Sequence, residues 1–403
     1  MEKRKTRDAL VDFWARQGYK PMTMSEVKAT LWRYTKDALD DDLALMWFRF
    51  VSDGHEGLVV RMGSEVWLIG WAAWIEQGCP CNTLAVVRSV RERPRFQDIC
   101  SWELKIRLLE TIQRVERPGK EARRHQAEDI LKMLEDGAYC VPASQGAAQD
   151  TVVRLGDWAE DVTAALPYAP EMLSKLSTPP AVQALLRERR RAEPCQILLE
   201  TTSSFASRVV TGNRSKENIP LVMNFANARH PGGGFLHGAR AQEEDLCRNS
   251  TLYASLSSRA AKAMYRYNRH AAPEDSDFML LSPEVLVVRE RGRFLPKPRK
   301  VAVATVAAPN RNGRAGKLKD DEIAAVLHQR LRRFFCMAAQ RGYRDLVLGA
   351  WGCGAFGNDP RMVAKIFHEL LFIEGFAWGF RKVSFAILGG GKNYEAFVSV
   401  FKG

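Results

Sequence analysis

Long apolar runs are missing from this 403-residue sequence. None approaches the roughly 20 consecutive apolar residues that a membrane-spanning helix requires. The first residues, Met1-Glu2-Lys3-Arg4-Lys5, are charged and lead into a mixed-charge segment without an apolar signal region. Internal repeats and low-complexity tracts are absent as well. We therefore expect a globular protein without membrane contact, located in the cytoplasm, or in the nucleus if the source is eukaryotic.

Cysteine is sparse, and its spacing does not suit a zinc site. Cys79 and Cys81 lie too close together for a zinc ribbon, and no second pair at ligand spacing follows. We therefore expect neither a metal nor a cofactor. The other cysteines are scattered, which is typical of free thiols in a reducing compartment; they are Cys100, Cys140, Cys195, Cys247, Cys336 and Cys353.

Acidic residues are outnumbered by basic ones. The chain has 47 Asp and Glu against 60 Lys and Arg, a formal net charge of +13. This excess favours polyanionic partners or substrates, nucleic acid among them, although a basic surface without such a partner is also compatible with it. The hydrophobic content of 46% is ordinary for a globular protein and sufficient for a sizeable core.

One break divides the amino-terminal part from the rest of the chain. Arg117-Pro118-Gly119-Lys120 interrupts helical spacing with a proline and a glycine, so we place a domain boundary there. We expect residues 1–117 to form a small α+β domain, residues 118–195 a helical accessory region, and residues 196–403 the main domain.

The amino-terminal domain shows a predicted hairpin but no catalytic pattern. Residues 57–62 and 65–69 are strand-like runs on either side of Gly63-Ser64. Helical spacing covers residues 7–17, 24–38 and 103–115. Tryptophans in this region would stack on bases if exposed, but core positions are the favoured interpretation; they are Trp71, Trp74 and Trp102.

The central part of the sequence is predicted to be helical. Helices are expected at residues 121–135, 151–166 and 181–192. The basic run at residues 187–191 could touch phosphates, although a solvated helix face is the favoured interpretation.

From residue 196 onward, strands alternate with helices, which indicates an α/β sheet covered on both faces. The expected strands are residues 197–201, 221–225, 300–307, 345–350 and 383–388. The expected helices are residues 203–210, 243–258, 319–339 and 360–374.

The most informative stretch follows the strand at 221–225. Asn224 and Asn227 stand at its end, and three glycines, Gly232-Gly233-Gly234, come next. Consecutive glycines permit positive φ and let backbone amides face an anion. After a short spacer, Gln242-Glu243-Glu244 opens a helix. Because carboxylates are favoured at any helix N-terminus, a glycine-rich turn before a solvated acidic first turn is the plain alternative.

A second glycine cluster, Gly352-Cys353-Gly354-Ala355-Phe356-Gly357-Asn358, follows the strand at 345–350 and precedes a helix primed by Asp359-Pro360. Its glycine spacing matches the dinucleotide fingerprint of Rossmann domains. That fingerprint is followed by an acid at the end of the next strand, whereas here the next strand ends in Gly389-Gly390-Gly391. We therefore reject a Rossmann dehydrogenase and retain a loop that cradles a diphosphate.

The spaced motif resembles the signature of the poly(ADP-ribose) glycohydrolases; it consists of Gly232-Gly233-Gly234, a spacer and Gln242-Glu243-Glu244. The flanking sequence resembles that of the bacterial-type branch of this family. The resemblance implies a three-layer α/β/α macrodomain with a mixed sheet, preceded by an accessory region of helix, short extended segment and helix. It also implies hydrolysis of the ribose–ribose O-glycosidic bond of poly(ADP-ribose), a polyanion that suits the positive net charge.

Adjacent carboxylates on one turn cannot straddle a glycosidic bond, so one glutamate should perform both proton transfers. Following the family motif, we assign Glu244 as acid and then base, and Glu243 as the ligand of a ribose hydroxyl. Burial and its charged neighbour should raise the pKa of Glu244. Asn224 and Asn227 would bind the ribose or orient the acids.

The second cluster resembles the phosphate loop of macrodomains, and two glycine loops could clamp one diphosphate from both sides. Phe356 would contact a ribose or base, with a core position as the equal alternative. We expect Phe397 rather than Tyr394 to stack on adenine, although core packing explains either. The expected ADP-ribose ligands are Asn224, Asn227, Gly232, Gly233, Gly234, Gln242, Gly352, Cys353, Gly354, Ala355, Phe356, Gly357, Asn358 and Phe397.

Two rival functions stay open at this stage. One is a non-catalytic macrodomain that binds ADP-ribose, and the other is an enzyme that removes ADP-ribose from nucleic acid or protein side chains. The Glu243-Glu244 pair favours catalysis, because a binding module does not need buried acids there. The sequence does not distinguish cleavage inside polymers from cleavage at their ends. We expect a monomer that binds poly(ADP-ribose) or another ADP-ribosylated macromolecule, with nucleic-acid contact through the basic surface as an option.

Overall fold

The computed structural model describes residues 119–402 except 142–149, 213–217, 274–275 and 291, together with four strands before them. The chain divides into two compact units, Met1–Gly119 and Lys120–Gly403. The predicted helices at 7–17, 24–38 and 103–115 and the three amino-terminal tryptophans lie outside the described residues.

The first unit contains an antiparallel sheet in the order β1-β2-β3-β4. Residues of β3 pair directly with those of β4, from Gly57 opposite Gly70 to Met62 opposite Glu65, which confirms the predicted hairpin. The strands are β1 (Tyr19–Pro21), β2 (Leu43–Phe50), β3 (Glu56–Met62) and β4 (Glu65–Gly70).

The second unit is a mixed α/β fold built on a seven-stranded sheet in the order β7-β10-β11-β9-β12-β13-β8. The pairings of β9 with β11 and β12, and of β13 with β12 and β8, are parallel. In this sheet β10 is antiparallel to both of its neighbours. The strands are β7 (Leu166–Tyr168), β8 (Gln196–Glu200), β9 (Leu221–Phe225), β10 (Met279–Glu290), β11 (Arg293–Val306), β12 (Asp345–Leu348) and β13 (Lys382–Ala386).

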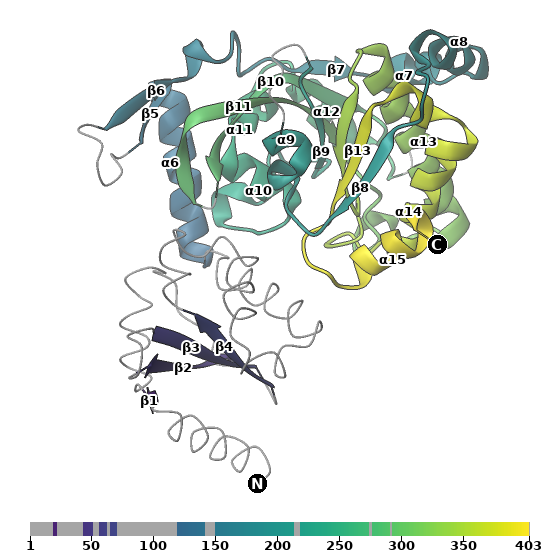
Figure 1. Ribbon diagram of the computed structural model, residues 1–403. Coiled ribbons are helices and arrows are strands. Elements are labelled where there is room, and N and C mark those ends of the chain that lie inside the picture. Colours follow the sequence, from purple (N-terminus) through teal and green to yellow (C-terminus); the bar gives the residue numbers. More distant parts are fainter. Residues whose placement is uncertain are drawn as a thin grey trace. The chain divides into compact units, whose positions relative to one another are not determined.

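Helices pack on both faces of this sheet (Figure 1). Side chains alternate along a strand, so Leu221 and Met223 of β9 enter one core while Val222 enters the other. The first core is covered by α7 (Pro170–Leu176), α8 (Pro179–Arg189), α13 (Asp320–Gln340), α14 (Pro360–His368) and α15 (Lys392–Phe401). The second is covered by α6 (Lys120–Asp136), α9 (Arg208–Thr211), α10 (Gln242–Asn249), α11 (Leu252–Ser257) and α12 (Lys262–His270).

The predicted helix at 151–166 is wrong. Its first residues form β6 (Thr151–Arg154), which pairs antiparallel with β5 (Ala138–Val141), and a 3₁₀ turn (Leu155–Asp157) follows. Thr151, Val152 and Val153 are β-branched and fit a paired strand better than a helix. Residues 118–195 therefore contain a β-hairpin between helices α6 and α7.

The predicted helix at 243–258 is two helices, α10 and α11. Ser250 is extended, with φ −152°, and bridges to Val287 of β10. The hydroxyl of Thr251 accepts a hydrogen bond from the amide of Leu286 at 3.0 Å. The helix breaks because two hydroxyl residues bond to β10 instead of continuing the ladder.

The sequence analysis missed the β10–β11 hairpin and found only the carboxyl-terminal half of β11. Gly292, with φ +76°, lies between the two strands and was the available signal. Prolines within both strands obscured the hairpin, because proline weakens a strand prediction. One of them, Pro283, coincides with a register shift between Ser282 and Val285.

No helix in the described part of the chain is both long and apolar enough to cross a membrane.

The first core contains a group of packed phenylalanines around Phe335. Its ring contacts those of Phe334, Phe367, Phe376 and Phe380, with centroids 5.4 to 6.2 Å apart. We expect Phe335→Ala to lower the free energy of unfolding by about 3–5 kcal/mol, because it leaves a cavity at a fully buried position. Denaturant unfolding measures this change.

The matched control is Phe372→Ala, because Phe372 is 38% exposed. It should cost no more than about 1 kcal/mol. Equal losses in the two variants would contradict the assignment of Phe335 to the centre of this core.

Candidate active site

The candidate site lies where parallel strands end at one edge of the sheet. The segments after β9, β11 and β12 meet there, because these strands are adjacent and point the same way. Contact between the segments is close: a side chain at Gly349 would come within 3.0 Å of the Phe225 ring. The segments that lead into the two glycine clusters of the sequence therefore start side by side.

Glu243 is held by both of its carboxylate oxygens. Its Oε1 accepts a hydrogen bond from Nδ2 of Asn224 at 3.2 Å, and its Oε2 accepts one from the amide of Asn227 at 2.7 Å. Asn224 is fully buried and also donates to Oγ1 of Thr305 on β11, at 3.3 Å. The asparagine at the end of β9 therefore orients the acid, as one of the two sequence alternatives proposed.

Gln242 attaches the start of α10 to β9. Its Oε1 accepts a hydrogen bond from the amide of Phe225 at 2.8 Å, and its Nε2 donates to the carbonyl oxygen of Met223 at 2.8 Å. Both partners are backbone groups of one strand, so this contact fixes the position of the helix N-terminus and of the two acids that follow.

Glu244 is held by one carboxylate oxygen only. The amide of Gly234 donates to its Oε1 at 2.8 Å. Its Oε2 is buried and has no hydrogen-bond partner among the described residues. The residue as a whole is 8% exposed. One oxygen is thus fixed by the backbone, while the other is enclosed and has no protein hydrogen-bond partner in the described part of the chain.

The first glycine turn requires glycine. Gly232 and Gly233 have φ of +68° and +57°, a conformation that residues with a Cβ rarely adopt. A Cβ at Gly233 would lie 2.4 Å from Oε1 of Glu244. The amide of Gly233 donates to the carbonyl of His230, and that of Gly234 donates to Glu244. These two amides of the turn therefore bond to protein acceptors, and the two-sided clamp of a diphosphate stays a prediction.

The second glycine turn has amides that face outward. Within the described part of the chain, the amides of Gly354, Ala355 and Phe356 donate to no protein acceptor. The turn is braced from behind, because Nδ2 of the buried Asn358 donates to the carbonyl oxygens of Pro309 and Gly352, at 2.9 and 3.1 Å. Such a row of amides suits an anion.

Two predicted aromatic ligands have different surroundings. Phe356 is half-buried in the second glycine turn, and its carbonyl accepts a hydrogen bond from the amide of Arg311 at 2.9 Å. Phe397 is fully buried against Phe385 and Phe401. Because core rings enclose it, Phe397 offers no face to an adenine, and the core alternative describes its position. Tyr394, the other candidate, is half-buried at the start of α15.

Sequence reasoning missed the arginines that hold the segment between the glycines and the acids. Nη1 of Arg248 donates to the carbonyl of Ala239 at 2.6 Å, and Nε of Arg123 on α6 donates to that of Gly238 at 2.7 Å. Arg248 follows Glu244 by four residues, about one helical turn. This spacing places both side chains on the same face of the helix and could have identified Arg248 from the sequence. The contribution of Arg123 depends on the position of α6, which no local pattern gives.

Burial, with the neighbouring charge of Glu244 as a smaller cause, raises the pKa of Glu243 to about 8. Hydrogen bonds from Asn227 and Asn224 act in the opposite direction and lower it. Glu243 is 2% exposed, so the protonated form is favoured near neutral pH. The described residues contain no group of three His, Cys, Asp or Glu placed to hold a metal ion.

Comparisons with known proteins point to one family. The family model described as microbial-type PARG, catalytic domain, matches residues 127–290, a range that contains the first glycine turn and both acids. PARG stands for poly(ADP-ribose) glycohydrolase. No curated protein matches the chain.

Solved structures of bacterial poly(ADP-ribose) glycohydrolases are similar to this chain. The Thermomonospora curvata protein is 38% identical, with a TM-score of 0.59, and the match covers 70% of this chain and 100% of that one. Its structure bound to the inhibitor ADP-HPD matches at 37% identity over the same shares, also with a TM-score of 0.59. The Deinococcus radiodurans protein in complex with ADP-ribose is 36% identical, with a TM-score of 0.53, covering 62% and 98% of the two chains.

The close approach at Gly233 gives a test of the turn. We expect Gly233→Ala to lower the free energy of unfolding by about 1–3 kcal/mol, because the positive φ is strained for alanine and the methyl group displaces Glu244. Gly354→Ala is the control, since no atom lies within 4 Å of its added Cβ and its φ is not positive. Equal stabilities of the two variants in denaturant unfolding would contradict the packing described here.

The burial of Glu243 predicts a pH dependence of stability. Its folded-state pKa of about 8 exceeds the unfolded value of about 4.3, so the folded state binds the proton more tightly. This contribution is complete below the unfolded pKa and is lost as pH rises through about 8. Relative to Glu243→Gln, the wild-type free energy of unfolding should fall between about pH 5 and pH 8, by up to about 1.4 kcal/mol per pH unit.

Denaturant unfolding of the two proteins in parallel over this range measures the difference. A difference that does not change with pH would show that Glu243 is ionised throughout.

Proposed function

The chain belongs to the microbial-type poly(ADP-ribose) glycohydrolases, and from this membership we propose which of its residues carry out the hydrolysis. The protein is a glycosidase that acts on poly(ADP-ribose). In our proposal Glu244 is the general acid and base, Glu243 binds a hydroxyl of the ribose beside the scissile bond, and the second glycine turn holds the diphosphate.

The observation that carries this proposal is the difference between the two oxygens of Glu244. The Gly234 amide fixes Oε1 at 2.8 Å, while Oε2 is buried without a protein partner. A general acid must reach the leaving oxygen with a defined orientation, and a carboxylate held at one end meets this need. The Glu243 carboxylate accepts hydrogen bonds at both oxygens, so it is less suited to move a proton.

The reaction then proceeds in two balanced steps. Protonated Glu244 donates its proton to the oxygen that links two riboses, the bond from the anomeric carbon to that oxygen breaks, and an oxocarbenium-like ribose forms. The Glu244 carboxylate next takes a proton from water, and the resulting hydroxyl adds to the anomeric carbon. The products are ADP-ribose and a shortened polymer, and Glu244 is protonated again.

Glu243 has capacity left for a ribose hydroxyl. An ionised carboxylate offers about four lone-pair sites, and the contacts from Asn224 and Asn227 occupy two of them. When protonated, which its raised pKa favours, Glu243 can donate a hydrogen bond to the same hydroxyl. Either state positions the ribose for Glu244.

The diphosphate is assigned to the second glycine turn. The amides of Gly354, Ala355 and Phe356 face outward and suit phosphate oxygens, and Phe356 lies beside them for contact with the ribose. Phe225, at the end of β9, lies against Gly349, just after β12, so the segments that lead to the two turns start side by side.

The finer expectations about organisation belong to the same proposal. We assign residues 196–403 to a three-layer macrodomain core, residues 118–195 to its accessory region, and residues 1–117 to a separate domain whose role is open. A monomeric state, a cytoplasmic location and nucleic-acid contact through the basic surface also stay predictions.

The test is Glu244→Gln. This variant should release no ADP-ribose from purified poly(ADP-ribose), with a rate loss of at least about 10²–10⁴-fold, because an amide cannot transfer the proton. It should still bind ADP-ribose in calorimetric titration. Asp245→Asn is a matched control on the same turn, since the Asp245 carboxylate lies 3.9 Å from Arg248 at the surface side of α10.

Asp245→Asn should keep its rate within a few-fold of the wild type. Undiminished turnover in Glu244→Gln would refute the assigned role. Loss of ADP-ribose binding in that variant would instead make Glu244 a binding residue.

A further inference from the structure

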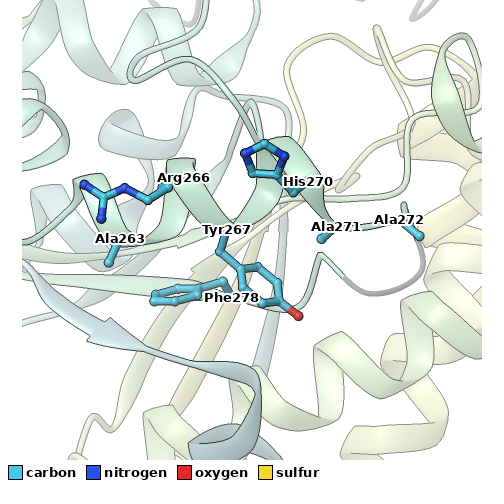
Figure 2. Close-up of a pocket in the computed structure, with 7 residues that line it drawn as sticks. All are labelled: Ala263, Arg266, Tyr267, His270, Ala271, Ala272 and Phe278. Carbon is cyan, nitrogen blue, oxygen red and sulfur yellow. The ribbon is translucent and has the colours of Figure 1, made fainter.

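An open cavity lies on the outer side of α12, apart from the residues assigned to the reaction. Its volume is about 680 Å³, within the range of small-molecule sites. Figure 2 shows Arg266, Tyr267 and His270 along the helix and Phe278 beside the Tyr267 ring. Ala263, Ala271 and Ala272 complete the lining. The alanine side chains are small, so the lining stays open beside the aromatic ring and the two basic groups.

The cavity combines an aromatic face with positive charge. Tyr267 is 36% exposed, and its ring is supported by buried Phe278, with centroids 5.7 Å apart and a tilt of 50°. The helix carries Lys262, Arg266, Arg269 and His270 and no acidic residue. Aromatic rings stack on nucleobases, and arginine binds phosphate oxygens, so this pairing suits a nucleotide-like polyanion.

The rim of the cavity is tied to the segment that follows β11. The carbonyl of Ala271 accepts a hydrogen bond from Nη1 of Arg314 at 3.2 Å. The buried guanidinium of Arg330 donates both to the carbonyl of Pro273, next to the cavity, and to that of Ala307, just after β11. The cavity and the strand edge that carries the site are therefore held by the same side chain.

That segment in turn contacts the second glycine turn. Nδ2 of Asn312 donates to the carbonyl of Ala355 at 2.9 Å, and the amide of Arg311 donates to that of Phe356, also at 2.9 Å. Arg314 stands two residues beyond Asn312. A short chain of contacts thus leads from the proposed diphosphate turn to the cavity.

The inner side of α12 faces the acids. Tyr265 is 3% exposed, and its hydroxyl has no hydrogen-bond partner among the described residues. Tyr265 packs in the same buried core as Leu246 and Cys247 of α10, the helix that carries both acids. Burial first, and the charge of Glu243 second, raise the pKa of its hydroxyl. One helix therefore borders the acids on one side and the cavity on the other.

From these contacts we propose that the α12 cavity binds the ADP-ribose unit adjacent to the one held at the second glycine turn, and so acts as a polymer subsite. The adenine stacks on Tyr267, and the diphosphate lies against Arg266 and His270. This inference rests on the proposed function, because it requires a polymer to be held at the Glu244 site. The subsite adds affinity for a chain of several units and none for free ADP-ribose.

The test compares the full-length wild type with Tyr267→Ala and Arg266→Gln on purified poly(ADP-ribose). Loss of one stacked base should raise KM for the polymer about tenfold in Tyr267→Ala at unchanged kcat, because the contact contributes equally to ground and transition states. Arg266→Gln should raise KM less and should weaken its dependence on salt, because one phosphate contact is removed. ADP-ribose affinity, measured by calorimetry, should stay at the wild-type value in both.

Arg269→Gln is the matched control, because Arg269 is exposed on the same helix but does not line the cavity. It should leave KM unchanged. Thermal unfolding establishes that each variant is folded; if Tyr267→Ala is not, Arg266→Gln against Arg269→Gln decides the question.

Several outcomes would overturn the subsite. An unchanged polymer KM in folded variants would do so, as would an equal loss of ADP-ribose binding, which would place these residues in the main site. The subsite would also be overturned if the variants lost affinity for an unmodified oligoadenylate while their KM for the polymer stayed unchanged. That result would identify the cavity as a nucleic-acid site. These outcomes are distinguishable from a failure of the proposed function. In that case Glu244→Gln would still turn over poly(ADP-ribose), whatever the result for the cavity variants.

Discussion

The organisation of the site depends on one hydrogen bond, from the Gly234 amide to Oε1 of Glu244. It forms only because the preceding glycines have positive φ and no Cβ, so that backbone and carboxylate can meet. The bond fixes one end of the acid and leaves Oε2 buried for a substrate. The arginines at Ala239 and Gly238, and Gln242 on β9, all stabilise the segment that makes this contact.

The second constraint is the direction of the strands. Because β9, β11 and β12 are parallel neighbours, the segments that begin at Ala307 and Gly349 come to the same edge as the segment that follows Phe225. The turn that holds a carboxylate and the turn suited to a diphosphate are thereby joined. The two turns differ in their hydrogen bonding. The amides of Gly233 and Gly234 donate to protein acceptors, whereas those of Gly354, Ala355 and Phe356 have no protein acceptor among the described residues.

The helices on this side of the sheet extend the same arrangement. The α10 helix carries both acids at its first turn, where the partial positive charge of the helix N-terminus stabilises carboxylates. Burial opposes this at Glu243 and raises its pKa. The α12 helix encloses the acids with Tyr265 and presents a basic, aromatic cavity on its other side. The proposed catalytic residues and the proposed polymer subsite would thus be linked through one helix.

The sequence by itself was sufficient to predict the alternation of strands and helices after residue 196 and to identify the two glycine clusters and the acids. Each of these features depends on the spacing of residues that are close together in the chain. The helix predicted at 151–166 was wrong, because its first residues are β-branched and pair with β5. The β10–β11 hairpin was missed, because prolines in both strands weakened the strand pattern. Only the tertiary structure showed which oxygen of Glu244 is free, that Phe397 belongs to the core, and that α12 borders a cavity. These properties depend on contacts between distant segments, and no local pattern encodes such contacts.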